Sequence, residues 1–340
     1  MDLPLKVPTH DNLDQACVLA VDVGGTKMAG AIVSPDGTII QERTAPTRGA
    51  SGTGDPLVNL IALLHELQSA AGLRQLRALG IALGIPGVTD HEGSSVRFAP
   101  GLGWHDVNIG ALLGQELNLP VWADNDVNVF LRGEVLRGSM RQVRNGLGIT
   151  IGTGIGASLL LEGRIYYGSH GGAGEIGYWA CDLPANSFHK EEFGQLERFA
   201  SGPGMARRAQ ALLAEDPQAG PILRELVADA LERITAESVC SAAQLGDEHC
   251  QLIVDETARA LGLVLANLSA VLDVERIVVG GGVAQAGELL LTPMRETIRR
   301  IAPYPPEVVQ SALGYRASMI GAAAGFWEKH SQLTGQQAVC

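Results

Sequence analysis

The chain has 340 residues, of which 46% are hydrophobic and 18% charged, and its formal net charge is −12 at pH 7. This length predicts two domains, each able to bury its own core. The negative charge argues against nucleic-acid and anionic-membrane partners, because both need clustered Lys and Arg. No apolar run approaches the roughly 18–20 residues of a membrane span, and the N-terminus resembles no secretory leader. Five scattered cysteines fit reduced thiols in a cytoplasmic protein.

The first half of the chain predicts strands interrupted by helices, after a polar tail at 1–15. Short apolar runs between turn residues predict strands at 17–23, 27–34, 38–43, 78–85 and 121–123. Apolar residues at helical spacing predict helices at 55–71, 108–117 and 126–137. The run at 78–85 is continuously apolar, which is typical of a central strand covered on both faces.

The second half repeats the beginning of the first: a strand, a Gly-rich loop, a strand, a turn and a strand. The strands expected here are 147–151, 157–161, 164–167, 276–279 and an edge strand within 306–313. The helices expected are 195–214, 222–235, 248–272, 286–300 and 317–330. Two copies indicate a duplicated supersecondary unit rather than a solenoid. The last helix is rich in small residues, which favours close packing.

The segment 22–27, DVGGTK, joins the first two predicted strands. Gly24 and Gly25 allow consecutive amides to point into one concavity, which can hold an anion. Thr26 adds a hydroxyl, Lys27 a positive charge, and Asp22 a carboxylate able to hold Mg²⁺ through water. The alternative is an ordinary hairpin turn, although tight hairpins favour two turn residues such as Asn-Gly.

Two further Gly-rich segments follow predicted strands. The run Gly152-Thr153-Gly154 can also hold phosphates, whereas a dinucleotide fingerprint would need another spacing and a following helix. The run Gly280-Gly281-Gly282 allows a flat ring or a phosphate to approach the backbone closely. A Gly-rich helix entry explains this last run equally well.

Carboxylates in two regions are candidates for chemistry on hydroxyl groups. The run Asp124-Asn125-Asp126 ends a short strand, where side chains of an α/β sheet reach a ligand site. One carboxylate there can act as a general base, or the run can cap the following helix, and both roles can coexist. Glu175 and Tyr178 can contact hydroxyls, whereas Glu197 by itself resembles a solvated helix residue.

Taken together, these motifs resemble the ROK family of repressors and sugar kinases, within the actin-like ATPase superfamily. The matching segments occur in family order over about residues 18–325. They are DVGGTK (22–27), ALGIPG (82–87), ADND (123–126), GE (133–134), ITIGTGIG (149–156), GEIGY (174–178), LERFASG (196–202) and VVGGGV (278–283).

The resemblance implies an α/β fold of two actin-like (ribonuclease H-like) domains with a ligand cleft between them. The smaller domain is expected at 16–124 plus 318–332, closed by the C-terminal helix. The larger one is expected at 125–317 and carries a helical insertion.

The resemblance also implies roles for single residues. Asp126 corresponds to the general base that removes a proton from the attacking sugar hydroxyl. The residues corresponding to substrate contacts are Asn125, Glu175, Tyr178, Glu197 and Gly87. The residues corresponding to the phosphate and adenosine loops are Gly24, Gly25, Thr26, Lys27, Gly152, Thr153, Gly154, Gly281 and Gly282.

Two departures from the family pattern concern zinc. Tyr178 stands where the family usually has a His that serves both sugar and zinc. The usual cluster of zinc cysteines is also missing, since the stretch before Leu196 offers only Cys181 and His189. Because zinc coordination needs about four N or S ligands, a zinc-free member is predicted.

The implied function is ATP-dependent phosphorylation of a hexose in carbohydrate metabolism, with glucose to glucose 6-phosphate favoured. ATP and Mg²⁺ are the expected cofactors, and a cytoplasmic homodimer is the expected assembly. Other acceptors stay open: fructose, mannose, N-acetylmannosamine and N-acetylglucosamine, as does polyphosphate as the donor. A non-enzymatic sugar-sensing repressor is the alternative from another class; the roughly 16 residues before the first strand are expected to be too few for its helix-turn-helix.

Overall fold

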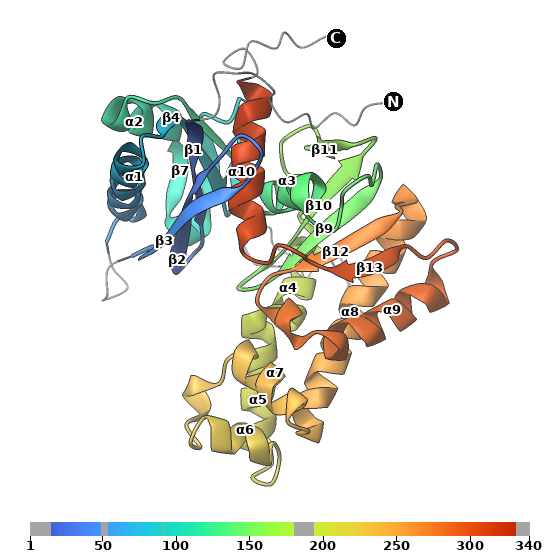
Figure 1. Cartoon of the computed structure of the whole chain (residues 1–340). Helices are drawn as coiled ribbons and strands as arrows, with labels where there is room; N and C mark the ends of the chain where they lie inside the picture. Colours follow the sequence, from blue (N-terminus) through green and yellow to red (C-terminus); the bar gives the residue numbers. More distant parts are fainter. Residues whose placement is uncertain (1–14, 49–53, 91, 180–193, 331–340) are drawn as a thin grey trace. The chain divides into compact units, whose positions relative to one another are not determined.

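The computed structural model describes residues 15–48, 54–90, 92–179 and 194–330. Contacts within the chain group them into two compact units, which are described separately (Figure 1). The first unit comprises Met1–Arg144, Leu159–Ala173 and Ala312–Cys340, and the second comprises Asn145–Ser158 and Gly174–Ser311. In the described ranges, no helix combines the length and the apolar character needed to cross a bilayer.

The first unit is built on a five-stranded mixed sheet with the order β3-β2-β1-β4-β8. The strands are β1 (Ala16–Val23), β2 (Lys27–Val33), β3 (Ile39–Pro46), β4 (Arg77–Ile85) and β8 (Val121–Asn125). Strands β1, β2 and β3 form an antiparallel meander, whereas β4 runs parallel to both β1 and β8. The predicted central position of the apolar strand is therefore confirmed.

Helices cover both faces of this sheet because β1 is apolar on both sides. Leu19 and Val21 join the core cluster with α1 (Pro56–Leu73) and α2 (Ile109–Leu117). Val18 and Ala20 point to the opposite face, into the cluster that includes residues of α3 (Asp126–Arg137) and α10 (Arg316–Lys329). This alternation follows from the two-residue period of a strand.

A small second sheet in this unit was absent from the sequence-based expectations. It has the order β5-β6-β7 and comprises β5 (Val88–Thr89), β6 (Val96–Ala99) and β7 (Trp104–Val107), with the 3₁₀ turn η1 (Pro100–Leu102). Strands of two to four residues give too short an alternation to be recognised.

Close backbone contact joins α3 to α10, as the small residues of the last helix predicted. A Cβ at Gly321 would lie 1.7 Å from the Val129 carbonyl oxygen, and a Cβ at Gly133 would lie 2.0 Å from that of Ala317. The buried Glu134 adds a second link, because its carboxylate accepts from the Leu313 amide at 3.1 Å. Both helices therefore belong to the same compact unit.

The other five-stranded sheet has the order β11-β10-β9-β12-β13. Its strands follow one another along the chain in the same spatial arrangement as those of the first five-stranded sheet. Its strands are β9 (Gly146–Ile151), β10 (Ile155–Leu161), β11 (Arg164–Tyr166), β12 (Arg276–Gly280) and β13 (Glu307–Gln310). Here β10 and β11 are antiparallel, and β12 is parallel to β9 and β13. The predicted duplication is confirmed, and β13 is the predicted edge strand.

The helical part of the second unit departs from two predictions. Its elements are η2 (Ile176–Tyr178), α4 (Gln195–Ala200), α5 (Gly202–Glu215), α6 (Pro221–Leu226), η4 (Leu231–Arg233), α7 (Ala236–Gln244), α8 (Glu248–Leu272), η5 (Val283–Ala286) and α9 (Glu288–Ile301). The expected helix 195–214 is two helices, because Ser201 leaves the helical conformation and caps α5. The expected helix 222–235 is wrong, because Ala228 and Asp229 adopt positive φ angles.

Replacing Gly321 by alanine tests the α3–α10 contact. The added methyl would overlap a backbone carbonyl, which cannot move as a flexible side chain can. Overpacking of this kind costs about 2–3 kcal/mol, so we expect the apparent Tm to fall by roughly 5–10 °C. Gly72→Ala in α1 is the control, because nothing lies within 4 Å of its added Cβ. Equal Tm values for the two variants would contradict the proposed role of this contact.

Candidate active site

The three residues of the run Asp124-Asn125-Asp126, at the junction of β8 and α3, have different surroundings. Asp124 is 2% exposed and lies inside the first unit. Its Oδ1 accepts from the Asn125 amide at 2.7 Å and from Asn128 Nδ2 at 3.0 Å. Burial raises the pKa of Asp124, while Arg132 and these hydrogen bonds act in the opposite direction. Asp124 is thus a structural anchor of the junction.

Asn125 caps α3, as one of the two sequence interpretations predicted. Its Oδ1 accepts from the amides of Val127 at 2.9 Å and Asn128 at 3.3 Å. Its Nδ2 donates to the Gly87 carbonyl at 3.0 Å, which ties the junction to the end of β4. A primary amide carries two N–H groups, so one remains for a ligand hydroxyl.

Asp126 and Asp22 flank the same glycine. A Cβ at Gly84 would lie 3.2 Å from Asp22 Oδ1 and 3.6 Å from the Asp126 Cα. Asp126 is half-buried in the first turn of α3, where the helix dipole favours a negative charge. Two predicted functional carboxylates from distant parts of the sequence therefore lie close together.

Asp22 fits a magnesium ligand. Burial raises the pKa of its carboxyl to about 7, although a hydrogen bond with Ser318 of α10 partly offsets this shift. A dehydrated carboxylate gains from a nearby cation, and Mg²⁺ is commonly held by one or two carboxylates together with phosphates and water. The described ranges contain no group of three or more His, Cys, Asp or Glu side chains that could hold a metal by themselves.

The first Gly-rich segment is a turn that is stabilised by a hydrogen bond from Thr47. The Gly24 amide donates to the Lys27 carbonyl at 3.0 Å, so it belongs to the turn itself. Thr47, which is fully buried, donates its hydroxyl to the Gly24 carbonyl at 2.6 Å. Gly25, Thr26 and Lys27 are exposed at the tip of the turn, where they are available to an anion.

In the second unit, the other Gly-rich loop contacts the predicted sugar-binding glutamate. Glu197 Oε2 accepts from the Ile155 amide at 2.8 Å. A Cβ at Gly154 would lie 2.7 Å from the same oxygen, so this position needs glycine. The loop is also tied to α5, because the Gly202 amide donates to the Gly152 carbonyl at 2.8 Å. Thr153 is exposed between the two glycines.

Glu175, Tyr178 and Glu197 form one acidic cluster beside this loop. Loss of hydration raises the pKa of Glu175, and the like charge of Glu197 raises it further. Loss of hydration also raises the pKa of Tyr178, with both glutamates adding to the effect. For Glu197, lost hydration raises the pKa and the Ile155 amide partly offsets this. Such clusters of acceptors at raised pKa are frequent in ligand sites.

The third Gly-rich segment touches the strand that carries the second loop. Gly281 has φ +89°, and a Cβ there would lie 2.3 Å from the Ile151 carbonyl oxygen. Gly282 has open space around its Cβ position and directly precedes η5. The segment is therefore a helix entry as well as a place where the backbone is uncovered, so both interpretations of its sequence fit.

The sequence motifs did not reveal several residues that build the site. Thr47, Arg132 and Tyr167 stand outside the glycine and carboxylate motifs, and they support the site through hydrogen bonds. Arg132 is marked in the sequence only as a charged side chain within an apolar segment, and Thr47 and Tyr167 carry no comparable signal. Glu134 belongs to a matched motif that had no assigned role, and it connects α3 to Leu313 in the segment before α10.

The prediction of a zinc-free protein rests on residues outside the described ranges. Cys181 and His189 both lie in the segment 180–193, which the structure does not describe. The prediction therefore stays a prediction.

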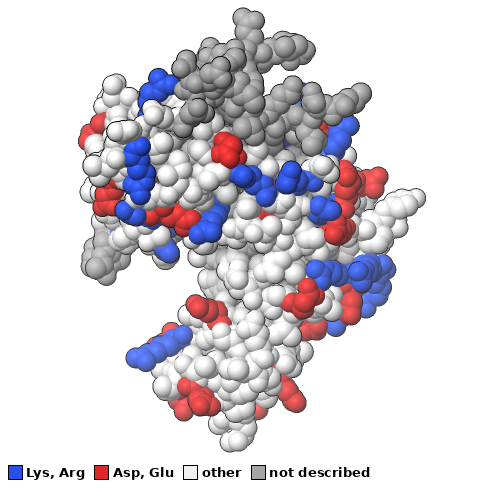
Figure 2. Space-filling model, viewed as in Figure 1, with Lys and Arg blue, Asp and Glu red and all other residues white. Residues whose placement is uncertain are grey.

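The second unit has a pocket that is not lined by the candidate site residues. It has a volume of about 310 Å³ between α9 and β13 and is lined by Arg295, Arg299, Glu307 and apolar neighbours. Arg295 pairs with Glu288 at 2.6 Å, and Arg276 pairs with Glu307 at 2.6 Å. Basic side chains lie among acidic ones on the face shown in Figure 2. None of the candidate site residues lines this pocket.

Comparison with known proteins identifies the family. A model of the ROK family matches residues 18–329. The chain belongs to the ROK family. A glucokinase from Halalkalibacterium halodurans is 33% identical over 311 residues, which cover 90% of this chain and 92% of that protein. A xylose repressor from Caldicellulosiruptor bescii is 27% identical over 317 residues, which cover 92% of this chain and 78% of the repressor.

A solved structure of the same family confirms the fold class. A ROK family glucokinase from Streptomyces griseus, in complex with glucose and AMPPNP, superposes with a TM-score of 0.78. It is 27% identical and covers 90% of this chain and 98% of its own. This ROK protein is thus an α/β protein with two actin-like domains, as its motifs predicted.

The acidic cluster predicts a stability effect that depends on pH. Because the pKa of Glu175 is raised, its ionisation destabilises the folded protein, and stability falls as the pH rises from about 4.3 through the raised pKa. Glu175→Gln removes this loss. We therefore expect its Tm to exceed that of the wild type by roughly 1–3 °C at pH 8, with the gain vanishing at low pH.

The control is Glu215→Gln, an exposed residue of α5 in the same unit. Thermal scans from pH 4 to pH 8 on both variants check the expectation. A gain for Glu175→Gln that is equally large at low pH would contradict a charge effect.

Proposed function

We propose that this ROK protein is an ATP-dependent sugar kinase that phosphorylates glucose at its 6-hydroxyl. The main support is the cluster of Glu175, Tyr178 and Glu197 next to the loop 152–154. It combines hydroxyl-binding acceptors with a phosphate-binding backbone in one unit. The similarity to glucokinases over nearly the whole chain gives the reaction class independent support.

In this proposal, the acidic cluster binds the sugar. Glu175 and Glu197 accept hydrogen bonds from sugar hydroxyls, and charged acceptors make these bonds stronger than neutral ones. Tyr178 is 45% exposed, so its phenol is accessible as a donor or an acceptor. Gly87 and Asn125 are further proposed sugar contacts. The amide of Asn125 is oriented by its bonds to α3 and to Gly87.

Asp126 is the proposed general base. It removes the proton of the attacking hydroxyl, a contribution of about 10²–10⁴ in rate. Phosphoryl transfer otherwise depends on positioning and on stabilising the phosphate charge. The proposed phosphate contacts are Gly25, Thr26, Lys27 and the loop 152–154. The proposed adenosine contacts are Gly281 and Gly282. When bound to Asp22, Mg²⁺ would neutralise phosphate charge.

A sugar-sensing repressor is the second candidate, because a xylose repressor is among the relatives. The two functions share sugar recognition and differ in turnover and in DNA binding. A gel-shift assay with operator-like DNA, with and without sugar, separates them from a kinase assay. Specific DNA binding without phosphoryl transfer would favour the repressor.

The central test of the kinase is Asp126→Asn. The amide keeps the shape of the side chain but cannot accept the proton, so we expect kcat to fall by about 10²–10⁴. Glucose binding, measured by calorimetry, should change little. Asp106→Asn, at an exposed residue of β7, is the control and should retain activity. Near-normal turnover of Asp126→Asn would remove Asp126 from the role of base.

A substrate screen tests the sugar and the donor. We expect ADP release to be fastest with glucose, and slower with fructose, mannose, N-acetylmannosamine and N-acetylglucosamine. ATP should support turnover and polyphosphate should not, and EDTA should abolish activity until Mg²⁺ is restored. A faster rate with any other acceptor or donor would replace glucose or ATP in the proposal.

We also propose a zinc-free, cytoplasmic homodimer. Two-fold dimers are the commonest oligomers of soluble proteins. Elemental analysis of the purified protein tests for zinc, and light scattering tests for the dimer. One zinc ion per chain, or a monomeric mass, would contradict the respective part.

A further inference from the structure

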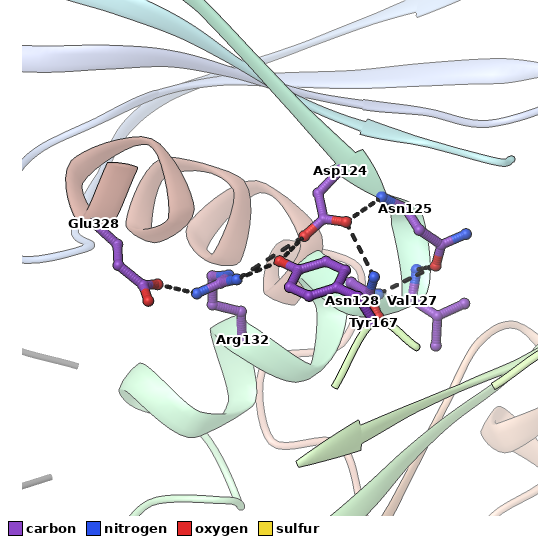
Figure 3. Close-up of polar contacts among 7 residues, drawn as sticks. All are labelled: Asp124, Asn125, Val127, Asn128, Arg132, Tyr167 and Glu328. Atoms are coloured by element: carbon purple, nitrogen blue, oxygen red, sulfur yellow. Dashed lines mark hydrogen bonds and ion pairs between the residues drawn. The ribbon is translucent and has the colours of Figure 1, made fainter. Parts of the chain in front are cut away.

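A buried polar network lies behind the junction of β8 and α3 in the first unit (Figure 3). Its members are Asp124, Asn128, Arg132, Tyr167 and Glu328, of which the first three are at most 5% exposed. Their elements are far apart in sequence, since Tyr167 follows β11 and Glu328 lies in α10. The network therefore connects the candidate site to remote parts of the same unit.

Tyr167 fills a gap that the two charged residues leave. Arg132 Nη2 and Asp124 Oδ2 are 3.9 Å apart, which is too long for a hydrogen bond. The Tyr167 hydroxyl donates to Asp124 Oδ2 at 2.7 Å and accepts from Arg132 Nη2 at 2.9 Å. The phenol thus bridges the carboxylate and the guanidinium by two hydrogen bonds, beside the longer ion pair that Figure 3 also draws.

The other end of Arg132 is fixed as well. Its Nη1 bonds to Glu328 of α10, and its guanidinium lies 5.6 Å from the centre of the Trp122 ring. Its Nε is buried without a hydrogen-bond partner among the described residues. A buried donor without a partner costs free energy, so among the described residues this orientation of the guanidinium carries a cost.

This arrangement is hard to explain by stability alone. Burying charged groups costs several kcal/mol per ion, and well-packed apolar residues are often at least as stable. The network instead fixes the orientation of the Asp124 carboxylate. With Oδ2 held by Tyr167, Asp124 presents Oδ1 to the Asn125 amide and to Asn128. Both of these partners lie at the start of α3, beside Asp126.

We propose that Tyr167 is a positioning residue for the pair Asn125-Asp126, acting through Asp124. This inference rests on the proposed kinase function, in which that pair contacts the sugar and removes its proton. Removing the hydroxyl frees Oδ2 of Asp124 and lets the carboxylate rotate. The start of α3 then loses its fixed orientation. A displacement of about 1 Å at reacting groups can cost up to about 100-fold in rate.

The test is Tyr167→Phe, with Tyr166→Phe as the matched control. Tyr166 is the neighbouring residue on β11 and is 50% exposed. With glucose and ATP, we expect kcat of Tyr167→Phe to fall about 10- to 100-fold, while both KM values stay within about threefold. A residue that served folding only would lower Tm and the yield of folded enzyme, but would leave kcat per folded molecule unchanged. Tyr166→Phe should match the wild type.

Hydrogen exchange gives a readout that does not need activity. The amides of Asn125, Val127 and Asn128 are bonded at this junction, so peptides covering 124–130 should exchange faster in Tyr167→Phe than in the wild type. Unchanged exchange, or an unchanged kcat in an active enzyme, would overturn the inference. If the wild type has no kinase activity, the proposed function fails. Hydrogen exchange at 124–130 then tests by itself whether Tyr167 positions the start of α3.

A milder variant guards against loss of folding. Glu328 is half-exposed at the outer end of the network, so Glu328→Gln weakens the hold on Arg132 without removing a core side chain. We expect kcat about threefold lower, unchanged KM values and intermediate exchange at 124–130. If Glu328→Gln matches the wild type in kcat and in exchange, Glu328 has no positioning role. If in addition Tyr167→Phe does not fold, the inference is overturned.

Discussion

The contact between the backbones of α3 and α10 is the constraint on which the first unit depends. Gly133 and Gly321 let the two helices approach so closely that neither position has room for a Cβ. Because the interior is densely packed, this contact leaves α3 little freedom to shift. It also brings Ser318 to Asp22 and Glu328 to Arg132. One helix near the end of the sequence thereby supports the carboxylates of the candidate site.

Asp124 in the first unit and the acidic cluster in the second have different surroundings. In the first, Asp124 is buried but surrounded by donors, so it is stable as an anchor. In the second, lost hydration raises the pKa of both Glu175 and Glu197, and the like charge of Glu197 raises that of Glu175 further. Protein stability is reduced where groups are kept available for a ligand. This contrast separates residues that hold the site from residues proposed to bind sugar.

Much of the fold was predictable because most of its strands are short apolar runs between turn residues. The duplicated order of strand, loop and strand appeared in both halves and proved to be the same sheet order. The broken helix after Leu226 was not predictable, since nothing in its local pattern required positive φ at Ala228 and Asp229. Glycine and carboxylate motifs pointed to the candidate residues, whereas the supporting Thr47 and Tyr167 belong to no motif.

The sequence by itself determined the family, the fold class and the candidate residues, because glycine spacing and strand-end carboxylates are local features. Only the tertiary structure decided which member of the run 124–126 anchors, which caps and which lies beside Asp22. That division depends on partners more than 30 residues away in the chain, such as Gly87 and Tyr167. Hydrogen-bond geometry between distant segments leaves no periodic trace in a sequence, so it becomes visible only after folding.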